Sequence, residues 1–412
     1  MKEFRKTTKL CHVGYDIRGP VADEAARMAA AGISIIPLNT GNPAVFGLYA
    51  PDFVEDALKN AVRRGEAYSD SIGVAEAREA VAAYYKTKGL RGVTAKDVFT
   101  GNGVSELINI TVQALLDNGD EILIPTPDYP LWTGVATLCG GKVVHYLCDE
   151  AADWQPDIRD IQNKITPKTK AIVLINPNNP TGALYPRETI EQVVKLAYEH
   201  DLMIFSDEIY DRLTFDGAEH VSTAAVDGAD DVFIVTFGGL SKSHMVAGYR
   251  SGWIAFSGRT DLARDYIEGV RMLASMRMCA NVPAQLVIPA ALEHAYSAAP
   301  LMAPGGRVYE QRECVYRAIT DIPGLSAVKP KAAFYIFPKI DVKRFDIVDD
   351  ERFVLDFLHE HHVLMTHGRG FNYPHPDHFR IVYLPEVSDL EEIAKRMRGF
   401  LSGYSQKGYA SE

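Results

Sequence analysis

The stretch that decides the fold is KAIVLINPNNPTGALYPRETIEQVVKLAYEHDLMIFSDEIY, residues 170–210. It begins with an apolar run at 170–176 and ends with another at 202–208, while 187–201 between them has apolar residues at i, i+3 and i+4. Runs of successive apolar residues, rather than alternating ones, indicate strands that are covered on both faces. The stretch therefore predicts two strands of a mainly parallel sheet joined by a covering helix, the repeating unit of an α/β fold.

The same pattern of apolar runs and amphipathic segments extends on both sides of this stretch. Short apolar runs alternate with longer amphipathic segments over about 160 residues, and each run is followed by turn or polar residues. The predicted strands of one seven-stranded sheet are 97–100, 121–125, 142–147, 170–176, 202–208, 231–237 and 251–256.

The pattern changes after residue 300. A loop, APLMAPGGR, precedes an amphipathic helix, three strand-like runs follow, and an amphipathic helix closes the chain at 386–404. This order predicts a small α+β domain beside the large one. We expect a large domain at 46–300, a small domain at 301–412, and an N-terminal segment, 1–45, that is part of the small domain.

Charge and hydropathy exclude two classes of partner. The chain has a net charge of −11 and no Lys/Arg-rich run, so it presents no basic face for a nucleic-acid backbone. No stretch approaches the roughly 20 apolar residues of a membrane span, and no apolar signal region follows the N-terminus. We expect a cytoplasmic protein that binds neither nucleic acid nor membrane.

Cysteines and histidines suggest neither disulfides nor a metal. The five cysteines are widely spaced, with no CxxC pair. A histidine-rich segment at 359–362, with His367 nearby, lacks the HExxH spacing that places two imidazoles on one helix face. We therefore expect no metal site.

Polar residues gather where three predicted strands end. The run at 170–176 leads into 176–182 (NPNNPTG). The run at 202–208 leads into 207–210 (DEIY), and the run at 231–237 leads into 238–242 (GGLSK). Ligands of open parallel sheets bind outside the carboxyl ends of the strands. These three segments are therefore expected to meet at one cleft.

At these residues the chain resembles the class I aminotransferases of the pyridoxal phosphate (PLP)-dependent transferase fold type I. The resemblance implies an α/β fold with a large domain and a small α+β domain. Each motif alone is weak evidence for this family, and the resemblance rests on their common order along the chain. The matching residues are Gly41-Asn42-Pro43, Tyr68, Gly73, Arg78, Gly103-Val104-Ser105, Tyr129-Pro130, Asn179-Pro180-Thr181-Gly182, Asp207, Tyr210, Ser241-Lys242, Arg250 and Arg380.

The resemblance implies catalytic roles for three of these residues. Lys242 would hold PLP as a Schiff base and then move the proton during a reversible ping-pong reaction through pyridoxamine phosphate. Asp207 would pair with the pyridine nitrogen, whereas an aspartate at a strand end could also merely cap a turn. Tyr210, with Asn179, would donate to the ring oxygen of the cofactor.

Further residues would hold the cofactor phosphate. Val104 and Ser105 open a predicted helix whose N–H groups and dipole favour a dianion, and Ser241 and Arg250 would complete the cup. The glycines at 101–103 are not a dinucleotide fingerprint, because Glu106 stands where a third glycine is needed. In the family Tyr68 reaches the phosphate of the neighbouring subunit, which implies a homodimer with shared active sites.

The remaining implied roles concern the pyridine ring and the substrate. Tyr129 would stack on the ring, Arg380 would bind the substrate α-carboxylate in a bidentate pair, and Gly41 and Asn179 would also contact substrate. Two departures from the family stand out. Gly239 replaces a serine that many relatives use as a phosphate ligand, and Ala332 replaces a glycine in the small domain.

Four motifs are similar to bacterial alanine aminotransferases that use pyruvate and glutamate: residues 15–20 (YDIRGP), 127–132 (PDYPLW), 239–242 (GLSK) and 279–283 (CANVP). Such a site must be small enough for alanine and still pair the distal carboxylate of glutamate. We expect Tyr15 to narrow the pocket and Arg18 to be a movable cation, although Arg18 could equally tether its segment. Arg277 ranks lower for this role.

Three other functions stay open on the sequence alone. A class I aminotransferase for aromatic or other amino acids would carry the same cofactor residues. So would a PLP-dependent C–S or β-lyase. A non-catalytic PLP-binding regulator is disfavoured, because the chain has no accompanying helix-turn-helix module or basic region.

Overall fold

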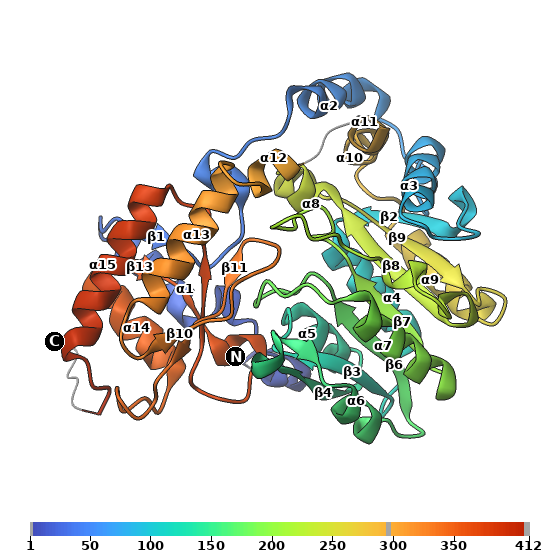
Figure 1. Cartoon of the computed structure of the whole chain (residues 1–412). Helices are drawn as coiled ribbons and strands as arrows, with labels where there is room; N and C mark the ends of the chain where they lie inside the picture. The colour runs from blue at the N-terminus through green and yellow to red at the C-terminus, as the bar shows by residue number, and fades with distance from the viewer. Residues whose placement is uncertain (1–2, 294–297, 408–412) are drawn as a thin grey trace.

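An eight-stranded sheet forms the centre of the computed structural model, which describes residues 3–293 and 298–407 (Figure 1). Its predominantly parallel arrangement agrees with the predicted α/β class, and all seven predicted strands are present. The eighth strand, β5, was not predicted, because two residues at a sheet edge leave no periodic signal. In spatial order the strands are β2 (Val98–Asn102), β9 (Ser251–Gly258), β8 (Phe233–Gly239), β7 (Met203–Asp207), β6 (Thr169–Ile175), β3 (Glu121–Thr126), β4 (Lys142–Asp149) and β5 (Gln155–Pro156).

Both faces of this sheet are buried, which explains the continuous apolar runs. On β6, Ile172 and Leu174 pack into one core cluster, while Ala171 and Val173 pack into another on the opposite face. The second cluster contains residues of α4 (Val104–Leu115), α5 (Leu131–Leu138) and α9 (Arg264–Met276). The first contains residues of α3 (Ala75–Thr87), α6 (Ile158–Lys164), α7 (Arg187–Glu199) and α11 (Ile288–Glu293).

The strand order creates a switch point within the sheet. From β3 the chain adds β4 on one side, whereas β6, β7 and β8 follow one another on the other side. All neighbouring pairs from β4 to β8 are parallel, so their carboxyl ends share one edge of the sheet. Ligands of open α/β sheets bind where the strand order reverses in this way. The expected site thus lies beside the ends of β3 and β6.

The C-terminal part forms a second core around three small sheets. Strands β11 (Tyr335–Ile336), β15 (Phe379–Val382) and β14 (Thr366–His367) make an antiparallel sheet, and β10 (Leu325–Ser326) pairs with β12 (Lys339–Ile340). Helices α13 (Arg307–Thr320), α14 (Asp350–His361) and α15 (Val387–Gly403) supply residues to the same core.

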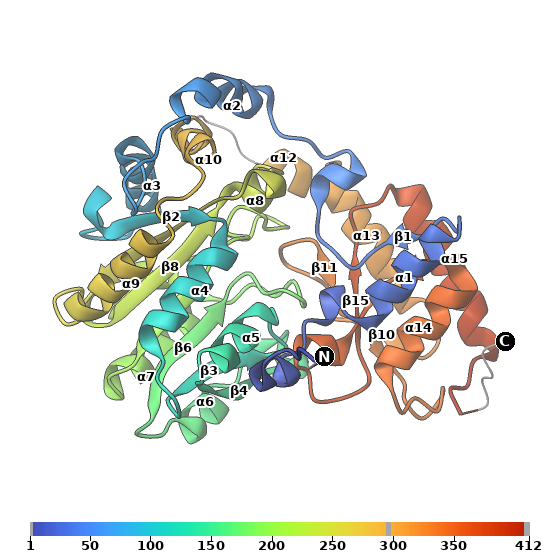
Figure 2. The ribbon, with the colours of Figure 1, turned by 180° about the vertical axis from the view of Figure 1, so that it is seen from behind.

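Most of the N-terminal segment lies against these C-terminal elements, while its first helix, η1 (Thr8–His12), contacts α5 of the large domain. Helix α1 (Pro20–Ala30) contacts α14, and β1 (Ile36–Pro37) pairs in parallel with β13 (Val363–Leu364). Figures 1 and 2 both show α1 and β1 among the orange and red elements, while the darkest blue helix, beside the label N, lies next to α5. The placement of α1 and β1 agrees with grouping them with the small domain, whereas η1 does not follow that grouping. The domain boundaries stay a prediction.

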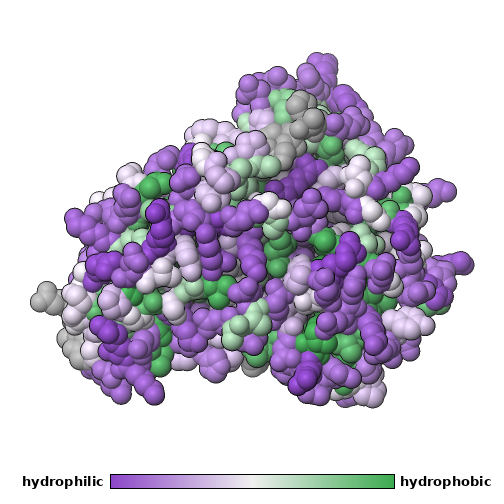
Figure 3. Space-filling view, viewed as in Figure 1, coloured by the Kyte–Doolittle hydropathy of each residue, from purple (hydrophilic) through white to green (hydrophobic). Residues whose placement is uncertain are grey.

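The other elements are short or peripheral. They are α2 (Asp52–Arg64), α8 (Leu240–Ser243), α10 (Val282–Leu286), α12 (Ala299–Met302) and the 3-10 helices η1 (Thr8–His12), η2 (Asp16–Arg18), η3 (Pro43–Phe46), η4 (Ala95–Asp97), η5 (Glu150–Ala152), η6 (Thr223–Ala225), η7 (Ala229–Asp231), η8 (Ala247–Tyr249) and η9 (Gly368–Phe371). Hydrophilic residues cover most of the face in Figure 3. Within the described residues no helix has the length and apolarity to cross a membrane.

Candidate active site

A cavity of about 670 Å³ lies at the carboxyl ends of the parallel strands. The loop after β6, the end of β7 and the short helix α8 after β8 all contribute to its wall, as the strand-end argument predicts. Thirteen of the fourteen predicted site residues line it, all but Tyr68: Tyr15, Arg18, Gly41, Val104, Ser105, Tyr129, Asn179, Asp207, Tyr210, Ser241, Lys242, Arg250 and Arg380.

Lys242 projects its amine into this cavity from α8. The Nζ atom donates a hydrogen bond to the backbone carbonyl of Gly41, at 2.5 Å, and lies 5.9 Å from the ring centre of Tyr210. No carboxylate of the described residues forms an ion pair with it. A lysine without an acidic partner keeps its amine available as a nucleophile or a base.

Asp207 ends β7 as a buried carboxylate. Its oxygens accept hydrogen bonds from the indole of Trp132, at 3.2 Å, and from the backbone N–H of Ile209, at 3.3 Å. No cation in the described part of the chain pairs with it, and burial raises the pKa of Asp207 to about 6. A buried acid of this kind is suited to a ligand that brings a positive charge, such as a protonated ring nitrogen.

The raised pKa of Asp207 predicts a pH-dependent effect of Asp207→Asn on the ligand-free protein. An acid whose pKa is higher in the folded state stabilises the fold most below its ordinary pKa of 3.8, and that contribution is lost as pH rises through about 6. Thermal or denaturant unfolding should therefore show the variant more stable than wild type by about 2–3 kcal/mol at pH 8, with the difference fading near pH 4. The exposed Asp56→Asn is the matched control, and parallel stability curves for Asp207→Asn and wild type would contradict the prediction.

The N-terminus of α4 and Arg250 lie together on the cavity wall, where they could hold an anion. No side chain caps this helix, so its first N–H groups at Val104 and Ser105 are available at the cavity wall. Gly103 precedes them with φ of +78°, and a Cβ there would lie within 2.0 Å of the Arg250 guanidinium. Glycine is therefore required for Arg250 to approach the helix, where its charge adds to the helix dipole. Ser241 offers a hydroxyl beside them.

Arg380 is a buried arginine without an acidic partner in the described residues. Its Nη1 donates to Oδ1 of Asn179 at 2.8 Å and its Nη2 donates to the carbonyl of Asn39, while its Nε is buried with no partner among these residues. Burial lowers the pKa of Arg380 from its ordinary value. A desolvated guanidinium is costly unless an anion completes its pairing, so this geometry favours a carboxylate ligand.

Four tyrosines surround the same space. The hydroxyls of Tyr15 and Tyr129 lie 2.9 Å apart, and those of Tyr210 and Tyr335 lie 2.5 Å apart. Burial raises the pKa of both Tyr129 and Tyr210 well above the ordinary value. These phenols therefore stay neutral and able to donate hydrogen bonds at physiological pH.

Arg18 differs from the other cations of the cavity. It ends η2, is exposed, and forms no ion pair or side-chain hydrogen bond with any described residue. An arginine with these properties can reorient at low cost. Arg277, the lower-ranked candidate, lies outside the cavity wall and is held by Glu106 at 2.5 Å and by three backbone carbonyls.

Tyr68 is the predicted residue that the cavity does not include. It lies in the loop between α2 and α3 with 80% of its side chain exposed. An exposed tyrosine away from its own cavity is free to contact another subunit, and that contact stays a prediction.

Three functional candidates were missed from the sequence: Tyr335, Trp132 and Asn39. The family motif at 332–335 could have indicated Tyr335, whose ring stacks 4.6 Å from the Arg380 guanidinium. A Cβ at Gly41 would collide with the Tyr335 hydroxyl at 2.4 Å, so glycine is required there. No sequence signal connects Trp132 to Asp207, because the contact joins α5 to β7 across 75 residues.

The structure also explains one departure from the family pattern. A Cβ at Gly239 would lie 2.8 Å from the backbone oxygen of Ser251 and 3.2 Å from Ile209. A serine cannot enter this position without a shift of β9. This chain therefore has no room, without such a shift, for the hydroxyl that many relatives place here.

Comparison with known proteins gives a consistent result. The family model "Aminotransferase class I and II" matches residues 33–397. The glutamate-pyruvate aminotransferase AlaA of Haemophilus influenzae (strain Rd) is 54% identical over 98% of this chain and 100% of its own length, and the alanine aminotransferase of Mycobacterium tuberculosis (strain H37Rv) is 50% identical over 98% and 94%. A crystal structure of an aminotransferase from Escherichia coli superposes with a TM-score of 0.96 at 52% identity, covering 98% of this chain and 100% of that one.

Proposed function

The chain belongs to the class I and II aminotransferases, and on that premise we propose that it moves the amino group of L-alanine to 2-oxoglutarate, giving pyruvate and L-glutamate. The relatives named for this reaction are 50–54% identical over nearly the whole chain. The proposed reaction is reversible and alternates between the two amino acids at one site.

One observation carries the substrate assignment: besides Arg250 beside α4, the cavity wall has one fixed arginine and one free arginine. Arg380 is buried and held by neighbours, which suits the α-carboxylate that every amino-acid substrate has. Arg18 is exposed and unpaired among the described residues, which suits a distal carboxylate that glutamate has and alanine lacks. A cation that can approach or withdraw allows one site to accept both substrates.

Pyridoxal phosphate fits the groups that line the cavity. Asp207 offers an unpaired buried carboxylate for the ring nitrogen, the N-terminus of α4 with Ser241 and Arg250 offers an anion cradle, and Lys242 offers the amine. When bound, the cofactor supplies an electron sink that stabilises the negative charge left at the substrate Cα after proton loss.

The chain itself supplies proton transfer and orientation. The Lys242 amine accepts the proton from the substrate Cα and donates it again in the next proton transfer. An amine without an ion-pair partner can act first as a base and then as an acid. Arg380 and Asn179 bind the α-carboxylate and so fix the Cα–H bond relative to Lys242. Tyr210 and Asn179 would donate hydrogen bonds to the ring oxygen of the bound cofactor and so favour its negative charge.

Assembly and location belong to the same proposal. We expect a homodimer with shared active sites, in which Tyr68 reaches the partner's phosphate site. The large apolar side chains that are exposed in the segments 45–68 and 272–278 would be available to such an interface. They are Val45, Tyr49, Val62, Tyr68, Met272, Met276 and Met278. A cytoplasmic location is expected as well.

Arg18→Ala should separate the two substrate classes. Removing the free cation is expected to raise KM for glutamate and 2-oxoglutarate by about tenfold, while KM for alanine and pyruvate stays within about twofold, because only the former have a distal carboxylate. Steady-state kinetics in both directions measure this. Arg27→Ala, which removes an exposed arginine paired with Glu24 on α1, is the control. Equal KM changes for alanine and glutamate would assign Arg18 a tethering role instead.

A coupled assay tests the reaction itself. Purified enzyme is incubated with L-alanine and 2-oxoglutarate, and pyruvate, glutamate and ammonia are quantified. The proposal expects pyruvate and glutamate in equal amounts and no ammonia. A β-lyase would instead release ammonia and pyruvate, without a keto-acid acceptor, from an amino acid that carries a sulfur leaving group on Cβ, such as L-cysteine. Faster turnover of an aromatic donor than of alanine would identify another specificity.

A further inference from the structure

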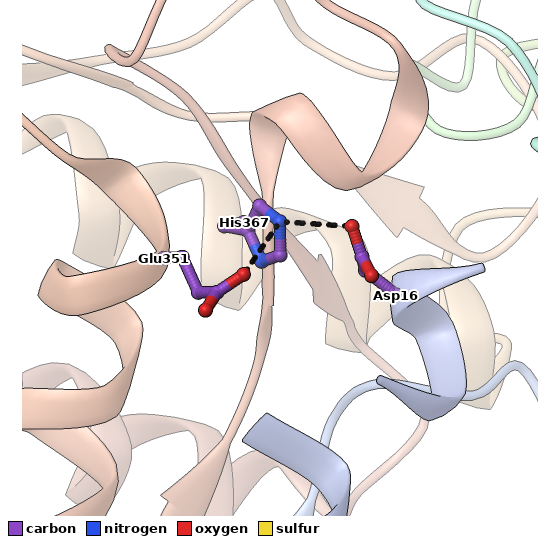
Figure 4. Close-up of side chains that lie close together, drawn as sticks. All are labelled: Asp16, Glu351 and His367. Atoms are coloured by element: carbon purple, nitrogen blue, oxygen red, sulfur yellow. Dashed lines mark ion pairs between the residues drawn. The ribbon is translucent and has the colours of Figure 1, made fainter. Parts of the chain in front are cut away.

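A three-residue contact fastens the N-terminal segment to the small-domain core. His367 of β14 lies between two carboxylates, with its Nε2 3.4 Å from Oδ2 of Asp16 and 3.7 Å from Oε2 of Glu351 (Figure 4). Asp16 begins η2, and Glu351 lies in the first turn of α14. A hydrogen bond between His367 and Asp16 lowers the pKa of Asp16.

The contact is closely packed and has a defined orientation. His367 is only 3% exposed, and its Nδ1 is buried without a partner among the described residues, so Nε2 is the nitrogen that serves the carboxylates. A Cβ at Gly370 would lie 3.1 Å from Cβ of Asp16 and 3.3 Å from Nε2 of His367. Glycine at 370 therefore lets η9 pack closely against Asp16 and His367. This packing restricts the motion of the two side chains.

The fastened segment carries three residues of the cavity wall, Tyr15, Ile17 and Arg18. Tyr15 precedes Asp16 and Arg18 ends the same 3-10 helix, and both line the cavity. Tyr15 contacts Tyr129 through its hydroxyl, and Asn39 donates to the carbonyl of Ile17 at 3.1 Å. Asp16 is the residue between the two cavity residues Tyr15 and Ile17, so its position sets theirs.

The other end of the contact is adjacent to the α-carboxylate site. In the register of β14 with β15, Thr366 lies opposite Arg380 and His367 opposite Phe379. Phe371, which follows Gly370 in η9, packs 4.5 Å from the Arg380 guanidinium. The same short elements thus support the fixed arginine and anchor the segment with the free one.

We propose that Asp16 and His367 form a positioning pair that fixes the backbone of residues 15–18 relative to Arg380, so that the side chains of Tyr15 and Arg18 can reach the cavity, and thereby determines the preference for dicarboxylate over short substrates. This inference rests on the proposed function of the cavity. Both residues act through Tyr15 and Arg18 and do not contact the substrate. Loss of the pair should leave Lys242 and Arg380 in place. Only the segment that carries Tyr15 and Arg18 should become more mobile.

Kinetics of His367→Leu and Asp16→Ala test the pair. Each is expected to raise KM for glutamate and 2-oxoglutarate by about five- to tenfold, with kcat and KM for alanine changed by less than about twofold. His367→Gln, whose amide nitrogen can replace Nε2, should restore most of the loss. The double variant should be no worse than either single one, because both break the same contact.

His359→Leu is the matched control. His359 also joins α14 to the N-terminal segment, through Nε2 at 2.9 Å from Oε1 of Glu24, but this contact lies on α1 rather than beside the cavity. Its loss should leave the substrate preference unchanged. If His359→Leu and His367→Leu shift the KM values alike, the effect is general loosening of the segment and the proposal is overturned.

A measurement without substrate separates this inference from the proposed function. Amide hydrogen exchange of residues 13–19 in the purified protein should accelerate in His367→Leu and Asp16→Ala and stay at the wild-type rate in His359→Leu. Unchanged exchange in all three would overturn the positioning role even if alanine transamination is confirmed. Accelerated exchange would support it even if the preferred amino acid is another one.

A bound metal ion is the competing explanation for this contact, because ligand atoms of Asp16, Glu351 and His367 lie within 4.8 Å of one another. Metal-bound histidines usually donate their other N–H to a carboxylate or carbonyl, and Nδ1 of His367 has no such partner among the described residues. Chelator treatment and added Zn²⁺ should therefore leave the exchange rate of 13–19 unchanged. A chelator-induced acceleration would overturn the hydrogen-bonded pair.

Discussion

Lys242→Ala should abolish transamination, with kcat lowered by at least about 10⁴-fold, because the variant loses both its nucleophilic amine and its proton carrier. Lys242 is the cavity lysine whose Nζ lies 2.5 Å from the carbonyl of Gly41 and without a carboxylate partner in the described residues. The protein should still fold and bind the phosphate group, since α4 and Arg250 are untouched. Single-turnover kinetics with alanine measure the loss.

Two comparisons make the Lys242 result specific. Added methylamine should restore part of the rate, because a small amine can enter the space of the missing side chain and carry the proton. Lys331→Ala removes an exposed lysine paired with Asp153 at 2.8 Å and should keep full activity. Near-normal turnover by Lys242→Ala would remove this residue from the mechanism.

Arg380→Lys has the second-largest expected effect, a fall in kcat/KM of about 10²–10³-fold for all substrates. Lysine keeps the charge but cannot form the bidentate pair, and removing one member of a buried charged hydrogen-bonded pair costs about 2–5 kcal/mol. The loss should be equal for alanine and glutamate, because both have the α-carboxylate. That equality distinguishes Arg380 from Arg18.

Arg312→Lys is the matched control for Arg380→Lys. Arg312 is also fully buried, but it pairs with Asp216 at 2.7 Å and with Glu313 at 2.6 Å. Its substitution should lower the unfolding temperature and leave KM near the wild-type value. If Arg380→Lys instead lowers stability and leaves kcat/KM unchanged, Arg380 is a structural residue.

The sequence predicted the sheet and most of the site because both depend on local signals. Apolar runs marked the seven main strands, and parallel strands share one edge, so the residues after β6, β7 and β8 had to meet. Family motifs then supplied residues from distant segments, such as Tyr15 and Arg380, which line the same cavity. Their catalytic roles stay predictions until the variants are measured.

What escaped prediction depends on contacts between distant segments. Trp132 reaches Asp207 and Tyr335 reaches Tyr210 through tertiary packing that no periodicity records. The steric exclusion of serine at 239 is visible only once β9 is in place. His367 was considered as part of a histidine-rich segment, yet its partner Asp16 lies about 350 residues earlier in the chain.

The most direct test of the central claim is the visible absorption of the purified protein during sequential addition of L-alanine and 2-oxoglutarate. The account predicts a band from bound pyridoxal phosphate that bleaches with alanine, with release of pyruvate, and returns with 2-oxoglutarate. A band that alanine leaves unchanged while another amino acid bleaches it would contradict the alanine assignment. Absence of any band after incubation with pyridoxal phosphate would contradict the proposed cofactor and the mechanism that depends on it.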